Sequence, residues 1–227
     1  MPTLNEKLQN IHNRLSLLLP QLGKICVRKI GLIPIQIEKI VVGVNKLSLY
    51  VSDSTPYEIN ENDLKYTSSI KDYAFRNCTS LTNITIPDSV TRIGGLAFYN
   101  CQGLTSITIP DSVTTIGVEA FEACSYLTHV EISERLTSIG SYAFFLCSSL
   151  TSIKIPNSVT YIGSGAFEYC DLLANIYLHP TTPPSLSNTD AIPNTTTIHV
   201  PIGSGDAYKS ATNWSYHSSR IVEDIEI

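Results

Sequence analysis

Charged side chains are scarce in this sequence, and basic ones are the scarcest. Asp, Glu, Lys and Arg make up 15% of the 227 residues. Residues 51–227 hold eight Lys and Arg against eighteen Asp and Glu, a net charge of −10. Because nucleic-acid binding needs several Lys or Arg contacts to phosphates, this acidic part excludes a nucleic-acid partner. Residues 1–50 carry seven Lys and Arg against two Asp and Glu, which suits an acidic partner, an anionic membrane or a plain solvated surface.

Long apolar runs are also missing. No stretch approaches about eighteen consecutive apolar residues, so we expect no transmembrane helix. The run Leu15–Leu19 is too short for a secretory signal, no basic cluster precedes it, and no small-residue cleavage site follows it. We therefore expect no cleaved signal, which leaves the export route open and does not exclude the cytoplasm.

Motifs for catalysis and metal binding are missing as well. The sequence has no Walker motif, no dinucleotide fingerprint, no H-E-x-x-H and no C-x-x-C pair. Gly203-Ser204-Gly205 is not a nucleophile elbow, and Glu119 and Glu122 pair two carboxylates where no pocket is implied. The histidines have no metal-ligand spacing; they are His12, His129, His179, His199 and His217. We therefore expect no enzyme activity, no metal site and no cofactor.

What the sequence does have is a period of 23 residues. Four residue types recur in step along the middle of the chain. They are Cys78, Cys101, Cys124, Cys147 and Cys170; Phe75, Phe98, Phe121, Phe144 and Phe167; Leu81, Leu104, Leu127, Leu150 and Leu173; and Ile70, Ile93, Ile116, Ile139 and Ile162. A fixed period of this length indicates a solenoid, in which each repeat buries its apolar face against its neighbours.

One repeat, Leu104–Tyr126, predicts the path of each coil. Ile107 and Ile109 alternate with polar residues, which indicates a half-buried strand, and Pro110 ends it. Val113 and Ile116 then point inward, and the spacing of Phe121 and Cys124 predicts about one helical turn. Stacked coils set their strands about 4.8 Å apart in a parallel sheet.

The repeat resembles the BspA-like class of leucine-rich repeats. The matching pattern is I-P-x-S-V-T-x-I-G-x-x-A-F-x-x-C-x-x-L-x-x-I, found at Ile86–Ile107 and Ile109–Val130, and the resemblance covers roughly residues 66–178. It implies an α/β leucine-rich-repeat solenoid, with a parallel β-sheet on the concave face and short helical or irregular segments on the other. Members of the family are known mostly as bacterial surface and adhesion proteins, with relatives in parasitic protists and bacteriophage.

The recurring cysteines are predicted to be a structural column of buried thiols: Cys78, Cys101, Cys124, Cys147 and Cys170. Adjacent coils are close enough for a disulfide, but side chains in one column point the same way instead of toward each other. The thiols also stand in an apolar register, where free cysteine packs as a small hydrophobe. Cys26, outside the repeats, is expected to be the most reactive.

The outward positions of the strands are the candidate ligand-binding surface, here called the strand face. They are Asn83, Thr85, Ser106, Thr108, His129, Glu131, Ser152, Lys154, Asn175 and Tyr177. These positions vary more than the columns between them, and solenoids bind partners on such faces. An ordinary solvated surface is the alternative, because exposed polar residues are common.

The third repeat departs from the pattern. It has Ser133-Glu134-Arg135-Leu136 where its neighbours have Pro-Asp-Ser-Val or Pro-Asn-Ser-Val. This weakens the strand stop and adds charge to the edge. Sequence drift is the interpretation that we favour, and a local binding feature is the other.

Four segments are predicted along the chain. Residues 1–25 carry a heptad-like seam, interrupted by Pro20, which either joins copies of the chain or packs within one copy. Its seam residues are Leu4, Leu8, Ile11, Leu15 and Leu18. Residues 26–57 predict a β-hairpin that covers the N-terminal coil, residues 58–178 the solenoid, and residues 179–227 a C-terminal cap. In the cap we expect a strand near Ile198–Val200 and a helix around Gly205–Trp214.

Two functions remain open at this point. One is a non-enzymatic adhesion module that holds a protein or glycan, expected to be extracellular, on the strand face. The other is a bacteriophage or surface-fibre component that assembles through the N-terminal segment as a homo-oligomer. The family resemblance favours the first, and the missing signal favours the second. Both imply a location at a cell surface, in the extracellular medium or on a virion.

Overall fold

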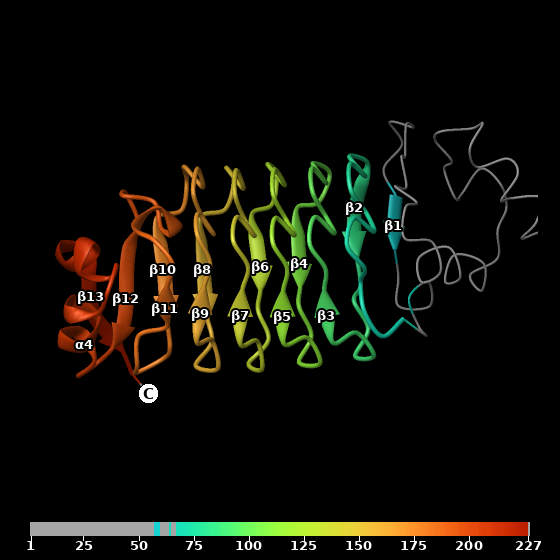
Figure 1. The fold of residues 1–227 in the computed structure, drawn as a ribbon. Helices are drawn as coiled ribbons and strands as arrows, with labels where there is room; N and C mark the ends of the chain where they lie inside the picture. Colours follow the sequence, from blue (N-terminus) through green and yellow to red (C-terminus); the bar gives the residue numbers. More distant parts are fainter. Residues whose placement is uncertain (1–56, 60–63, 65–66, 227) are drawn as a thin grey trace, which may run out of the picture.

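The structure is a computed structural model that describes residues 57–59, 64 and 67–226. The seam predicted over residues 1–25, the hairpin strands predicted near residues 32–51, and Cys26 all lie outside this part of the chain. Within it the chain winds into the predicted solenoid, with each coil crossing one side of the molecule and returning along the other (Figure 1).

The first side of the solenoid carries one strand from each coil. These strands are β2 (Leu81–Ile84), β4 (Ser106–Thr108), β6 (His129–Glu131), β8 (Ser152–Ile155) and β10 (Asn175–Leu178). Residues 23 apart are partners in the parallel pairs, as in Ser106 with His129 and Ser152 with Asn175. At the N-terminal end β1 (Tyr57–Ile59) pairs with β2. The strands predicted by alternation are therefore confirmed.

A second parallel sheet lies on the opposite side of the coils, and the sequence analysis missed it. Its strands are β3 (Arg92–Ile93), β5 (Thr115–Ile116), β7 (Ser138–Ile139), β9 (Tyr161–Ile162) and β11 (Ser185–Leu186). Each of these strands has two residues: the apolar one is buried, as Ile116 is, and the one before it is exposed or half-buried, as Thr115 is. A strand of two residues contains one apolar position, so it leaves no alternation in the sequence to detect.

The helical turn predicted from the spacing of Phe121 and Cys124 is wrong. The chain makes consecutive turns there, with φ of 56° at Glu119 and 59° at Ala123, values that no right-handed helix contains. The amide of Phe121 donates to the carbonyl of Ala143 in the next coil at 2.8 Å. Because the backbone bonds run between coils, the ladder continues through the turns, and Phe121 and Cys124 face inward without a helix.

Columns of identical side chains fill the space between the two sheets. The rings of Phe75, Phe98, Phe121, Phe144 and Phe167 stack with centroids 5.2, 5.0, 5.2 and 5.4 Å apart and interplanar angles between 3° and 15°. All of these rings are buried, as are the Leu and Ile columns beside them. The spacing of the strands therefore sets the spacing of the rings, and each coil supplies one layer of the core.

The cysteines of the repeats lie beside this stack, buried and without disulfides. The Sγ of Cys101 donates to the carbonyl of Phe75 at 3.1 Å, and that of Cys124 to the carbonyl of Phe98 at 3.1 Å. Cys147 and Cys170 repeat the contact one and two coils later. Burial raises the pKa of Cys124 and of Cys170 to about 12, so these thiols stay protonated at neutral pH.

After β11 the chain completes the C-terminal end with two strands and short helices. β12 (Thr197–Pro201) pairs with β10, and β13 (Ile221–Ile225) pairs with β12. Between them lie α4 (Gly205–Ser210) and the 3-10 helix η3 (Ser215–Arg220), and a second 3-10 helix, η2 (Thr189–Ala191), precedes β12. The strand expected near Ile198–Val200 is present, whereas the helix expected to reach Trp214 ends at Ser210.

Buried aromatic side chains attach this segment to the last coil. Tyr208 donates from its hydroxyl to the carbonyl of Pro180 at 2.8 Å, and Trp214 donates from Nε1 to that of Pro184 at 2.7 Å. The two rings meet edge to face, 5.1 Å apart. Both polar groups thus find carbonyls in the irregular stretch between β10 and β11, where the repeat pattern has ended.

His217 and Arg220 form the polar part of the same attachment. Arg220 donates to the carbonyls of Pro193 and Thr196, at 2.7 Å each, and to Nδ1 of His217. His217 is fully buried, and burial, followed by the nearby Arg220 charge, lowers its pKa to about 4. The folded protein therefore holds His217 neutral at pH values where an unfolded chain would protonate it.

Removing one ring from the phenylalanine stack tests the core. Phe121→Ala leaves a cavity between Phe98 and Phe144, and we expect it to lower the free energy of unfolding by about 3–5 kcal/mol, measured by urea denaturation. Tyr126→Ala, at an exposed tyrosine in the same coil, is the matched control and should change the free energy by less than about 0.5 kcal/mol. Equal losses in the two variants would contradict the stacked core.

Thiol reactivity tests the cysteine column. At pH 8 the native protein should react with Ellman's reagent at Cys26 alone or not at all. The five column thiols are buried, and burial raises the pKa of a thiol such as that of Cys124, so little thiolate is present to react. In denaturant all six cysteines of the chain should react. Two or more fast-reacting thiols in the native state, or fewer than six in denaturant without reductant, would show a different arrangement.

The buried histidine predicts a loss of stability in mild acid. Between the unfolded pKa near 6.5 and the folded value of about 4, the unfolded chain binds the proton and the folded chain does not. The free energy of unfolding should therefore fall as the pH is lowered through this window. The variant His217→Gln should lose less stability than the wild type between pH 7 and pH 5, measured by thermal unfolding. If the two proteins lose the same stability between pH 7 and pH 5, His217 is not the cause of the loss.

Candidate functional site on the strand face

The strands hold the predicted ligand-binding residues on one surface of the molecule. Inward residues such as Ile107 and Val130 are buried in the core, which fixes the strands and turns the alternating side chains outward. Asn175 is half-buried, and the other nine predicted positions are exposed: Asn83, Thr85, Ser106, Thr108, His129, Glu131, Ser152, Lys154 and Tyr177. The strand face is therefore a set of outward positions on strands whose other side is buried in the core.

The strand face is divided between β2 and β4 and again between β6 and β8. β4 pairs with β6 in one sheet, while β8, β10, β12 and β13 form another. The predicted positions on its central strands differ most in chemistry: His129, Glu131, Lys154 and Tyr177. Of these, Lys154 and Tyr177 are register partners. Glu131 accepts a hydrogen bond from Thr108 at 3.1 Å, and Lys154 forms an ion pair with Glu134 at 3.0 Å. Glu131 and Lys154 therefore have different partners, and Glu134 is the carboxylate beside Lys154.

A shallow hollow of about 550 Å³ lies where β4 and β6 end. Four carboxylates and one guanidinium line it: those of Asp88, Asp111, Glu131, Glu134 and Arg135. The amide of Glu134 donates to Asp111 at 3.3 Å, and the hydroxyl of Ser133 to the carbonyl of Val113 at 3.3 Å. The signal for this hollow was the departure of the third repeat, where Ser133 replaces the proline that stops the neighbouring strands.

The sheet of β8, β10, β12 and β13 contains a histidine, His199, with hydrogen bonds at both ring nitrogens. The sequence analysis did not select it. Nδ1 of His199 hydrogen-bonds to Oδ2 of Asp224 at 2.7 Å, and Nε2 to Oδ1 of Asn175 at 2.9 Å. The ring of Tyr177 stacks on that of His199, with centroids 4.5 Å apart. Because an amide, and not a hydroxyl or thiol, meets the second nitrogen, the Asp224–His199 pair orients a ring and activates no nucleophile.

These contacts produce a row of side chains across four strands. Lys154, Tyr177, His199 and Val222 are successive register partners on β8, β10, β12 and β13. His199 follows Tyr177 by 22 residues instead of 23 and lies beyond the irregular stretch at residues 179–184, so the period could not place it. The tertiary pairing of β12 with β10 brings it into the row.

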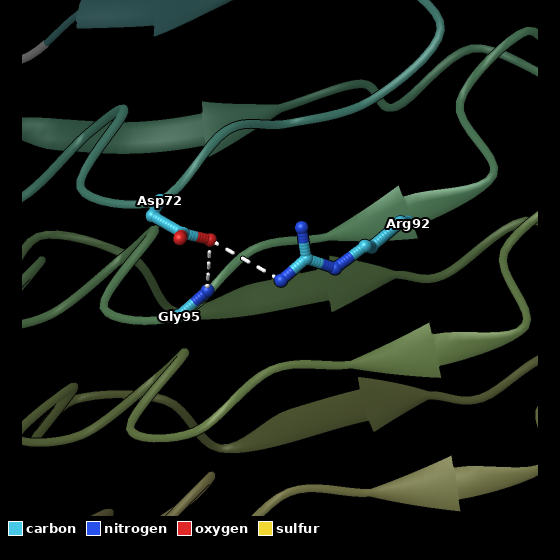
Figure 2. A network of polar contacts seen from close by, with 3 residues as sticks. All are labelled: Asp72, Arg92 and Gly95. Atoms are coloured by element: carbon cyan, nitrogen blue, oxygen red, sulfur yellow. Dashed lines mark hydrogen bonds and ion pairs between the residues drawn. The ribbon is translucent and has the colours of Figure 1, made fainter. Parts of the chain in front are cut away.

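Other polar groups of the described chain have simpler roles. Figure 2 shows Asp72 accepting from the amide of Gly95 at 2.8 Å and pairing with Arg92 at 3.3 Å. Both side chains of the ion pair are about half exposed, so it contributes little stability, and it joins the first coil to the second on the side away from the strand face.

Within residues 57–59, 64 and 67–226, no cluster of three His, Cys, Asp or Glu suits a metal ion, and no helix is long and apolar enough to cross a membrane.

Comparisons with known proteins agree with this architecture. Residues 65–186 match the BspA-type leucine-rich-repeat region, in six copies. No curated protein matches the chain. A leucine-rich-repeat protein of T. pallidum is 27% identical with a TM-score of 0.50, and the match covers 59% of this chain and 62% of that one.

Two further solved structures are similar over less of their length. A leucine-rich cell surface protein of Faecalibacterium prausnitzii is 31% identical, with a TM-score of 0.41 and coverage of 64% of this chain and 42% of that one. The pneumococcal vaccine antigen PcpA is 18% identical, with a TM-score of 0.47 and coverage of 62% and 40%. The chain therefore spans less than two thirds of each of these three proteins.

Proposed function

The chain belongs to the BspA-type leucine-rich-repeat family, and from this membership we propose that it is a non-enzymatic binding module that holds an extracellular protein on its strand face. Leucine-rich repeats commonly serve protein binding or adhesion and are typically non-enzymatic. The T. pallidum protein carries the same repeat, and the F. prausnitzii protein is described as a cell surface protein. A place at the cell surface follows for this chain as part of the proposal.

The row Lys154–Tyr177–His199–Val222 is the observation that carries this proposal. Its members differ in chemistry, while the residues beneath them are the uniform apolar columns of the core. Two hydrogen bonds and a ring contact fix His199, so little conformational freedom is lost when a partner binds. Exposed aromatic groups on a rigid base are the side chains that interfaces favour.

A protein is the ligand that the row suits better than a glycan. Tyr177 and His199 stack on each other, so each covers a ring face that a sugar would need. The ring edges, the half-exposed Lys154 that pairs with Glu134, and the apolar Val222 are the groups that a partner can reach, a mixture that fits a protein surface. A glycan ligand is the outcome that the experiment below would reveal in its place.

A binding screen with paired variants tests the proposal. The full chain is applied to an array of extracellular matrix and host-surface proteins and, in parallel, to a glycan array. The variant Lys154→Ala/Tyr177→Ala/His199→Ala should bind the retained protein about 30-fold or more weakly, since truncated hot-spot residues cost about 1–2 kcal/mol each. The control Thr115→Ala/Ser138→Ala/Tyr161→Ala shortens three side chains on the second sheet and should bind like the wild type.

Three results would count against the strand face as a protein-binding surface. The strand-face and second-sheet variants could bind a retained protein equally well, retention could be confined to glycans, or neither array could retain the chain. Thermal unfolding of both variants, within a few degrees of the wild type, establishes that lost binding is not lost folding.

A further inference from the structure

Exposed apolar side chains collect on the turns that follow β7 and β9, away from the strand face. The exposed fractions are 37% for Tyr142, 41% for Leu146, 53% for Tyr169 and 59% for Leu172. Phe145 joins them, because its ring meets that of Tyr142 at 5.4 Å and that of Tyr169 at 5.2 Å, edge to face in both cases. These contacts join Tyr142, Phe145 and Tyr169, and Leu146 and Leu172 lie on the same two turns. The five residues are here called the turn ridge, and exposed apolar patches on soluble proteins mark interaction sites.

The coil does not need apolar residues at these positions. Leu146 and Tyr169 stand where the first two coils have Asn77 and Asn100, whose side chains hydrogen-bond to each other at 3.0 Å. All four backbones are left-handed, with φ of 62° and 57° at the asparagines and 58° at both Leu146 and Tyr169. Asparagine tolerates that conformation, while large side chains adopt it at a cost in free energy. Because Tyr73 and Leu96 share this conformation, the coil itself imposes it, and the exposed apolar side chains of Leu146 and Tyr169 are what distinguishes them from the asparagines.

Carboxylates border the turn ridge. Glu168 and Asp171 flank Tyr169 along the chain, and Glu119 and Glu122 lie in the coil before Phe145. Burial, and then the adjacent Glu119, raise the pKa of Glu122, as expected where negative charge is only partly compensated. A second copy of the same ridge is a poor partner, because pairing would bring these carboxylates together. The partner must offer apolar side chains and positive charge.

The N-terminal segment of the chain has both properties. Its apolar seam, Leu4, Leu8, Ile11, Leu15 and Leu18, recurs at the spacing of one helix face. Residues 3–25 hold three Lys and Arg against one Glu, a net charge of +2. We propose that the turn ridge binds residues 3–25 of the same molecule, apolar seam against apolar ridge.

The connection is long enough for this. Between Ile25 and Leu64 lie 38 residues, and each spans up to about 3.3–3.6 Å when extended, or roughly 130 Å together. The turn ridge lies about four strand spacings from Leu64 along the solenoid, which is roughly 20 Å. Covalent linkage gives the segment a high effective concentration at its own ridge, which favours this pairing over exchange between copies. The strand face remains free, so the inference is independent of the proposed function.

Photo-cross-linking in the full chain tests this contact. p-Benzoylphenylalanine replaces Tyr169 in one sample and, as a control on the strand face, Val222 in another, and the cross-linked peptides are identified by mass spectrometry. We expect position 169 to cross-link to residues 3–25, and position 222 not to. Equal amounts of ¹⁵N-labelled and unlabelled chains are mixed before irradiation, so that pairs within one molecule show a single isotope pattern.

Two further variants connect the cross-link to the seam. Leu8→Asp should lower the yield at position 169 at least fivefold, whereas Asn13→Asp, which adds the same charge off the seam, should leave it within twofold. Cross-links that join labelled to unlabelled chains, that reach only residues beyond 57, or that are insensitive to Leu8→Asp would overturn the proposal. Thermal unfolding of each variant, unchanged within a few degrees, shows that the solenoid is intact.

Discussion

The ladder of backbone hydrogen bonds between successive coils is the constraint on which the rest of this protein depends. It joins each coil to the next through the strands and through the turns, as in the bond from the amide of Phe121 to the carbonyl of Ala143. Equivalent side chains are thereby held one strand spacing apart, which suits flat rings stacked at 5.0–5.4 Å. Inward positions repeat the same or a similar apolar residue, while outward positions are free to differ. The residues that form the core and the residues that vary are therefore different positions of one repeat.

The free positions form two surfaces of different chemistry. The strand face presents polar groups and two stacked rings on short strands, and the turn ridge presents aromatic and leucine side chains bordered by carboxylates. Where β4 and β6 end, at the repeat that has Ser133 in place of the proline, four carboxylates line a hollow. At the C-terminal end, buried Tyr208 and Trp214 attach α4 and the residues after it to the stretch between β10 and β11, and the charged side chains of β13 discourage further strand pairing.

The sequence predicted the parts of this structure that repeat. The spacing of Phe75 to Phe167 indicated the stacked core, and the alternation around Ile107 located the strands together with the outward residues of the strand face. The second sheet was missed because strands of two residues carry no alternation. The helical turn was wrongly predicted because i, i+3 spacing also arises in consecutive turns, and only the left-handed backbone at Glu119 and Ala123 distinguishes the two.

What the sequence determined by itself is thus the coil: its length, its inward columns and its outward positions, since each depends on contacts with an equivalent residue 23 positions away. What only the tertiary structure decided is every contact between unlike segments. His199 reaches Asn175, Tyr177 and Asp224 because β12 and β13 join the sheet after an irregular stretch whose length hides the register. Likewise Glu134, and not Glu131, meets Lys154. Periodicity specifies neighbours only where the period is kept, and beyond that the path of the loops determines which residues meet.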